Sequence, residues 1–113
     1  MIKAILFLVC FMHSMANESA GVPTKGMIYY KYLIKEKVGI RGDLFSKQYT
    51  TKEWITLFDN NATLFKKQFS GIDPQLDTLL NSAKFLEIMP HLKAFVIHYA
   101  KDKTDSATCE EKE

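Results

Sequence analysis

Apolar residues recur every three or four positions along several stretches between residues 28 and 99, the spacing of one face of an α-helix. The clearest stretch covers residues 50–71. Thr50 and Glu53 have the T-x-x-E spacing of a capping box, and Gly71 is a natural stop. The apolar face between them comprises Ile55, Phe58, Ala62, Phe65 and Phe69. This segment is therefore predicted to be an amphipathic helix.

Three poor helix formers, Asp59, Asn60 and Asn61, lie in the middle of that stretch. Either they face solvent within one helix, or they mark a break after which a second helix begins. Because the apolar pattern continues past them without a change of phase, we predict one continuous helix.

Residues 27–38 are compatible with two structures. Ile28, Tyr30, Tyr32 and Ile34 alternate as in a strand, but the segment also has helical spacing. The run LIKEKVG contains good helix formers and ends in Gly39, a residue that favours a helix C-terminus. No second convincing strand is available to pair with it, so we predict a helix.

The last apolar stretches cover residues 73–99. Asp73 and Pro74 have the residue types of an N-cap and a first helical position. The expected buried positions after them are Leu76, Leu79, Leu80, Ala83 and Leu86. Pro90 is expected either to kink this helix or to start a new one. The positions after Pro90 that we expect to face the core are Leu92, Phe95, Val96 and Tyr99.

These patterns predict an all-α fold, a small bundle of three to four short amphipathic helices after an N-terminal signal-like segment. We expect four segments: a leader over residues 1–16, a linker over 17–26, a helical domain over 27–101 and an acidic, disordered tail over 102–113.

The leader has the three parts of a secretory signal. Lys3 provides a positive start, residues 4–12 are apolar, and Ser14 and Ala16 suit a cleavage site. The apolar run is about half the ~20 residues that span a membrane. We therefore predict export, to the periplasm or out of the cell. The alternatives are an uncleaved anchor that contacts the membrane, a buried helix, and a cytoplasmic chain that starts at Met27.

Composition and charge narrow the possible partners. The chain of 113 residues is 47% hydrophobic and 25% charged, as in ordinary globular proteins. Residues 28–101 carry a net charge of +4 and residues 102–113 a net charge of −3. Arg41 is the single arginine in this basic body, whereas nucleic-acid surfaces have denser positive patches with several arginines. Nucleic acid is therefore not an expected partner.

The sequence contains no GxGxxG, GxxxxGK[ST], HExxH or GxSxG motif, so we expect neither catalysis nor a cofactor. Of the two cysteines, Cys10 lies in the leader and Cys109 among acidic residues that disfavour a thiolate. The one metal-ligand candidate set is Glu87, His91 and His98. Two features argue against a metal site formed by these three residues. Pro90 lies between Glu87 and His91 and is expected to alter their geometry, and the two histidines are ~10 Å apart along a helix.

The expected function is therefore that of an exported, non-catalytic binding or accessory module for a protein or a membrane-associated complex. An exposed aromatic patch would supply the contact surface, and its expected members are Tyr29, Tyr32, Tyr49 and Trp54. Alternatively, these rings fill the small core. The alternative is a small metal- or haem-binding carrier that uses His91 and His98. Neither the aromatic residues nor the two histidines indicate an oligomeric state.

Asn17-Glu18-Ser19 and Asn61-Ala62-Thr63 match the N-x-[ST] acceptor pattern for N-linked glycosylation. Acceptors are usually in accessible loops. Because Asn61 is expected in the middle of a helix, we interpret its match as coincidental.

Overall fold

The computed structural model describes residues 21–104, and these residues form helices and no strands, as predicted. The leader over residues 1–16, residues 17–20 of the expected linker, and residues 105–113 of the tail lie outside the described residues. Cys10 and Cys109 are among them. No helix within residues 21–104 combines the length and the hydrophobicity that crossing a membrane requires.

The chain enters the fold through a helical column made of α2 (Pro23–Tyr29), the π-helical turn η1 (Tyr30–Ile34) and α3 (Lys35–Val38). The prediction of a helix rather than a strand here is confirmed. Gly39 ends the column with φ 75°, and its N–H donates to the carbonyl of Lys35. This left-handed conformation is the one that favours glycine.

The column begins earlier than the sequence pattern indicated, since residues 23–26 were expected to be linker. Pro23 occupies the start of α2, where its missing N–H is harmless. Gly26 is buried against α7 (Ala83–His98): a Cβ on Gly26 would lie 1.9 Å from the carbonyl oxygen of His91. The N–H of Val22 donates to Nδ1 of His91 at 2.9 Å. The end of the expected linker is therefore part of the core packing.

Two short turns, α4 (Gly42–Phe45) and η2 (Ser46–Gln48), lead to the longest element, α5 (Thr51–Phe69). The predicted capping box is present. Thr50 Oγ1 accepts a bond from the N–H of Glu53, and the Glu53 carboxylate accepts one from the N–H of Thr50. Both bonds satisfy N–H groups that the first helical turn leaves without a partner.

The prediction of one continuous helix over residues 50–71 is wrong. Asp59 is extended, and Asn60, Asn61 and Ala62 all have left-handed backbone angles with φ between 55° and 62°. Asparagine tolerates this conformation better than most residues, which explains why the break falls here. In the helical piece before the break, Trp54 is in the core, while Ile55, which was expected on the buried face, is 41% exposed.

α6 (Pro74–Leu80) begins as predicted, because the Asp73 carboxylate accepts bonds from the N–H groups of Gln75 and Leu76. The expected burial of Ala83 and Leu86 is wrong. The helix stops before Ser82, whose hydroxyl caps α7, and the new phase leaves Ala83 exposed and Leu86 51% exposed. Pro90 lies inside α7 and starts no new helix.

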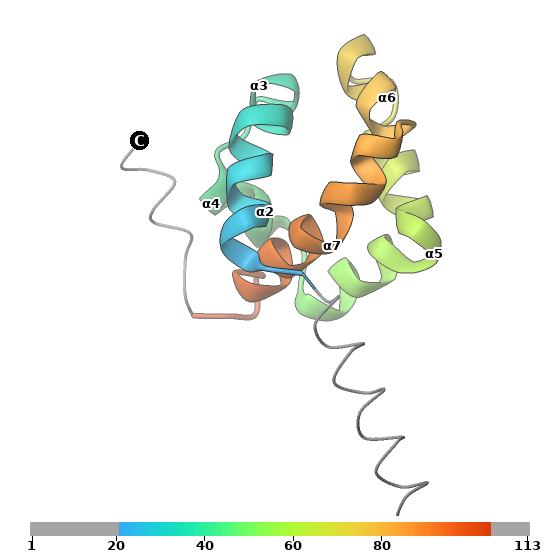
Figure 1. Cartoon of the computed structure of the whole chain (residues 1–113). Helices are drawn as coiled ribbons and strands as arrows, with labels where there is room; N and C mark the ends of the chain where they lie inside the picture. Colours follow the sequence, from blue (N-terminus) through green and yellow to red (C-terminus); the bar gives the residue numbers. More distant parts are fainter. Residues whose placement is uncertain (1–20, 105–113) are drawn as a thin grey trace, which may run out of the picture.

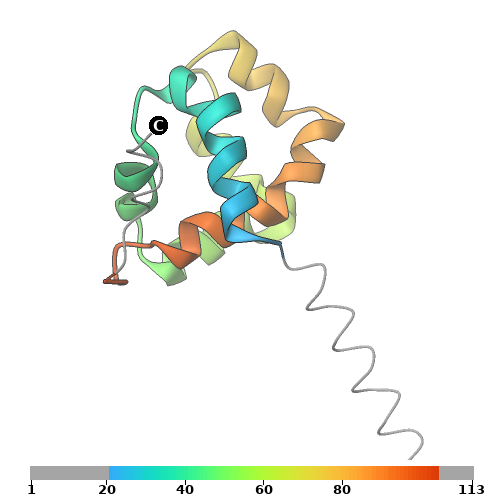
Figure 2. The same ribbon diagram turned by 60° about the vertical axis from the view of Figure 1, so that its left-hand side comes forward.

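α7 is the central element. Figure 1 shows the α2–α3 column on one side of α7 and α5 with α6 on the other, and α7 contacts α2, α5 and α6. Figure 2 shows the α2–α3 column crossing α7 near the start of α2. Most aromatic residues of the described part build the core, where the fully buried rings are Tyr30, Phe45, Trp54, Phe65, Phe85 and Phe95. Leu92, Phe95 and Val96 are buried as predicted.

The fold continues past the expected boundary at residue 101. The Asp102 carboxylate accepts bonds from the N–H and the hydroxyl of Thr51, at 2.8 and 3.0 Å. Lys47 Nζ donates to the carbonyls of Ala100 and Lys103. The start of the expected tail is therefore fixed against the first turn of α5.

Candidate binding groove on helix α5

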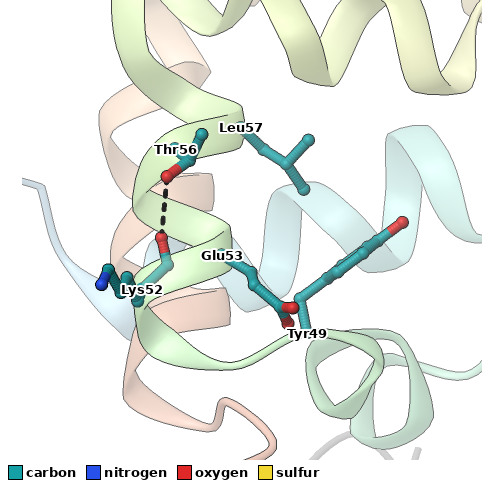
Figure 3. Close-up of a pocket in the computed structure, with 5 residues that line it drawn as sticks. All are labelled: Tyr49, Lys52, Glu53, Thr56 and Leu57. Atoms are coloured by element: carbon teal, nitrogen blue, oxygen red, sulfur yellow. Dashed lines mark hydrogen bonds between the residues drawn. The ribbon is translucent and has the colours of Figure 1, made fainter.

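An apolar groove opens on the surface at the beginning of α5. It has a volume of about 370 Å³ and is open to solvent; its lining residues are Tyr49, Lys52, Glu53, Thr56 and Leu57. Figure 3 shows the side chains of Tyr49 and Leu57 facing the same gap from two sides, with Glu53 between them and Lys52 directed away. The two larger walls are therefore apolar, and the charged groups lie beside them.

Both the ring and the backbone of Tyr49 are fixed by contacts with the rest of the fold. Its ring makes an edge-to-face contact with Trp54, with centroids 4.9 Å apart and an interplanar angle of 77°. Trp54 is fully buried and its indole N–H donates to the carbonyl of Ser46 at 2.9 Å. The carbonyl of Tyr49 accepts a bond from the N–H of Lys101. This wall is therefore fixed before any ligand arrives, which reduces the entropy cost of binding.

The opposite wall is one face of α5. Glu53 and Leu57 are four residues apart and share that face. The Glu53 carboxylate already accepts the capping bond from Thr50, and the Thr56 hydroxyl donates to the carbonyl of Lys52 at 3.1 Å, as drawn in Figure 3. Because these polar groups have intramolecular partners, the groove offers a bound molecule mainly apolar surface.

The electrostatics of this end of α5 are set in part by Asp102. The backbone N–H of Thr51 lowers the pKa of the Asp102 carboxyl below its usual range, since the bond favours the ionised form. A carboxylate next to a helix N-terminus also complements the helix dipole. The C-terminal segment thus supplies an additional cap to the helix that forms the groove.

The predicted aromatic contact residues have different positions. Tyr49 lines the groove, but Trp54 is buried beneath it and cannot belong to an exposed patch. Trp54 is four residues before Phe58 and shares its buried face of α5, which leaves Ile55 outside the core. Tyr32, on η1, is 70% exposed. Tyr29, on α2, is half-buried, with its ring 5.9 Å from that of His91.

The predicted metal-ligand residues have separate partners. Glu87 lies 3.6 Å from Lys84 Nζ, His91 accepts the bond from Val22, and the exposed His98 packs its ring on Tyr99. Within residues 21–104, no three His, Cys, Asp or Glu side chains are grouped so that they could hold a metal ion. The continuation of α7 through Pro90 is the physical reason, because it keeps His91 and His98 two turns apart.

Sequence reasoning missed Lys52, Glu53, Thr56 and Leu57 as site residues. A signal was present in Leu57, a large apolar residue beside the predicted buried stripe of its helix. The wall formed by Tyr49 had no such signal in the sequence, since the contact between Tyr49 and Trp54 depends on the path of the turn that precedes α5.

No protein-family model, curated protein or solved structure matches this chain.

Proposed function

We propose that this chain is an exported, non-catalytic binding module, an accessory to another protein or to a membrane-associated complex, and that its contact site is the groove on α5. The observation that carries the proposal is the gap between Tyr49 and Leu57, whose walls are positioned by contacts within the fold. Apolar anchors that fill such gaps provide much of the energy of protein–protein contacts.

The shape of the groove favours an apolar side chain of a protein partner over an enclosed small molecule. Its volume of about 370 Å³ is at the low end for ligand pockets, which enclose most of the ligand. This groove is open on its outer side. A leucine, methionine or phenylalanine of a partner could pack between Tyr49 and Leu57 while its backbone stays outside. Glu53, which lies between the two walls, would then provide a negative charge beside the anchor.

Export is supported by the leader sequence, with its positive start, short apolar run and small residues at a cleavage position. N-terminal sequencing of the protein from its source cells tests this part of the proposal. We expect a chain that starts at Asn17. A soluble cytosolic chain that retains Met1 would contradict export.

The binding proposal is tested by the native size of the protein in extracts of its source cells. We expect wild type to elute from a size-exclusion column in a complex larger than 13.0 kDa, and Leu57→Lys to elute as the free chain. The substitution removes the apolar wall formed by Leu57 and puts a charged, hydrated group in its place, so an apolar side chain of a partner would no longer be covered. Ile55→Lys is the matched control, since Ile55 is on the same helix, is exposed and does not line the groove.

The same elution for wild type and Leu57→Lys would contradict the proposed contact site. Circular dichroism of both variants must match that of wild type, so that a loss of the complex reports binding and not unfolding.

A further inference from the structure

We propose that Asn61 is a site of N-linked glycosylation. The proposal rests on the proposed export of the chain, because the transfer takes place on exported proteins. It concerns the turn that interrupts α5 and is independent of the groove. Asn61-Ala62-Thr63 matches the acceptor pattern, and the objection to it was the expected position in the middle of a helix.

The structure removes that objection. Asp59 is extended and the next three residues are left-handed, so that the acceptor segment forms an outward turn between two helical pieces. Asn60, Asn61 and Thr63 are exposed, while Ala62 is fully buried. The segment is thus anchored by Ala62 and presents both the acceptor amide and the required hydroxyl residue to solvent.

The side chain of Asn61 is available for modification. Among residues 21–104 it has no hydrogen-bond partner, whereas the adjacent Thr63 hydroxyl donates to the carbonyl of Asn60. A sugar attached to Asn61 would extend into solvent and would displace no packed residue. N-linked glycans are bulky and hydrophilic and require this kind of surface position.

The chemistry requires one co-reactant, an oligosaccharide linked to a lipid pyrophosphate, and a membrane-bound transferase. The amide nitrogen of Asn61 attacks C1 of the first sugar. A C–N bond forms, the bond between C1 and the phosphate oxygen breaks, and the lipid pyrophosphate leaves with the bonding electrons. The amide nitrogen loses one proton to a base of the transferase, so no oxidant or reductant is needed.

Asp59 adds information about the transferase. It lies two residues before Asn61, in the sequence Asp59-Asn60-Asn61-Ala62-Thr63. N-linked transferases differ in whether they require an acidic residue at that position. The Asp59→Asn variant therefore separates the two classes of enzyme.

The test is the mass of one peptide from the full chain, purified from its source cells. Trypsin cleavage after Lys52 and Lys66 releases peptide 53–66, which contains Asn61. We expect this peptide to carry the mass of an oligosaccharide, located at Asn61 by fragmentation. Thr63→Ala should abolish the added mass. Asn60→Asp, which leaves the acceptor pattern intact, should retain it.

The N-terminal residue of the same sample distinguishes the possible failures. An unmodified peptide 53–66 from a chain that starts after the leader would overturn the glycosylation proposal and leave export standing. An unmodified peptide from a chain that retains Met1 would overturn both. Sugar on Asn17 alone, the other match to the pattern, would support export and overturn the assignment to Asn61.

Discussion

Gly26 lies where the backbones of α2 and α7 come close together. A Cβ there would lie 1.9 Å from the carbonyl oxygen of His91 and 2.7 Å from Cβ of Phe95. We therefore predict that Gly26→Ala lowers the free energy of unfolding by about 1–3 kcal/mol, the usual cost of overpacking. Chemical denaturation monitored by circular dichroism measures this change.

Whether Gly26→Ala lowers or raises the free energy of unfolding shows whether α2 packs closely on α7. In a helix without a close neighbour, glycine to alanine stabilises by about 1 kcal/mol. A more stable Gly26→Ala variant would therefore mean that residues 23–26 do not pack on α7. Gly39→Ala is the control: a Cβ there meets nothing within 4 Å, and its cost comes from its φ of 75° alone.

At the scale of single elements, the break in α5 is tested at Asn60, which has φ 55° and is exposed. In the left-handed turn, Asn60→Ala should lower the free energy of unfolding by about 1 kcal/mol, while Asn60→Gly should change it little. In a continuous helix the order reverses, because alanine is then the better residue. Urea denaturation of both variants distinguishes the two cases.

The attachment of the C-terminal segment to α5 predicts a dependence on pH. The folded-state pKa of Asp102 is lowered, so its carboxylate stabilises the fold above the unfolded-state pKa. This contribution is lost as pH falls through the folded-state value, below about pH 4. The melting temperature of Asp102→Ala should be lower than that of wild type at pH 7, and the difference should shrink as the pH is lowered through this range. A constant difference would contradict the assignment.

The elements themselves were largely predictable, because their signals are local. The capping box at Thr50, the caps at Asp73 and Gly39, and the helical spacing of the core positions each act within one or two turns. Their ends were harder to predict. The break at Asn60 keeps the apolar pattern nearly in phase, so periodicity alone could not reveal it. The start of α2 depends on a contact with α7 that is distant in sequence.

At the scale of the whole molecule, the all-α fold class could be predicted from the sequence, and the groove on α5 could not. Amphipathic segments without strand partners allow only a helical fold. The groove, by contrast, requires the Tyr49 ring to lie across from Leu57, and that follows from the packing of Trp54, the turn before α5 and the bond from Lys101. None of these contacts has a local signature. The aromatic residues were recognised as important, but the sequence could not separate Tyr49, which lines the groove, from Trp54, which supports it.

Site-specific photocrosslinking in source cells shows whether the groove on α5 binds a partner protein after export. A photoreactive residue replaces Leu57 in the groove, and in a second strain it replaces Leu64, which is 45% exposed on α5 but does not line the groove. We predict one discrete protein adduct from position 57, lost when Tyr49→Ala removes the opposite wall, and none from position 64. Equal adducts from both positions, or no adduct from position 57 in the exported protein, would contradict binding of a partner at the groove.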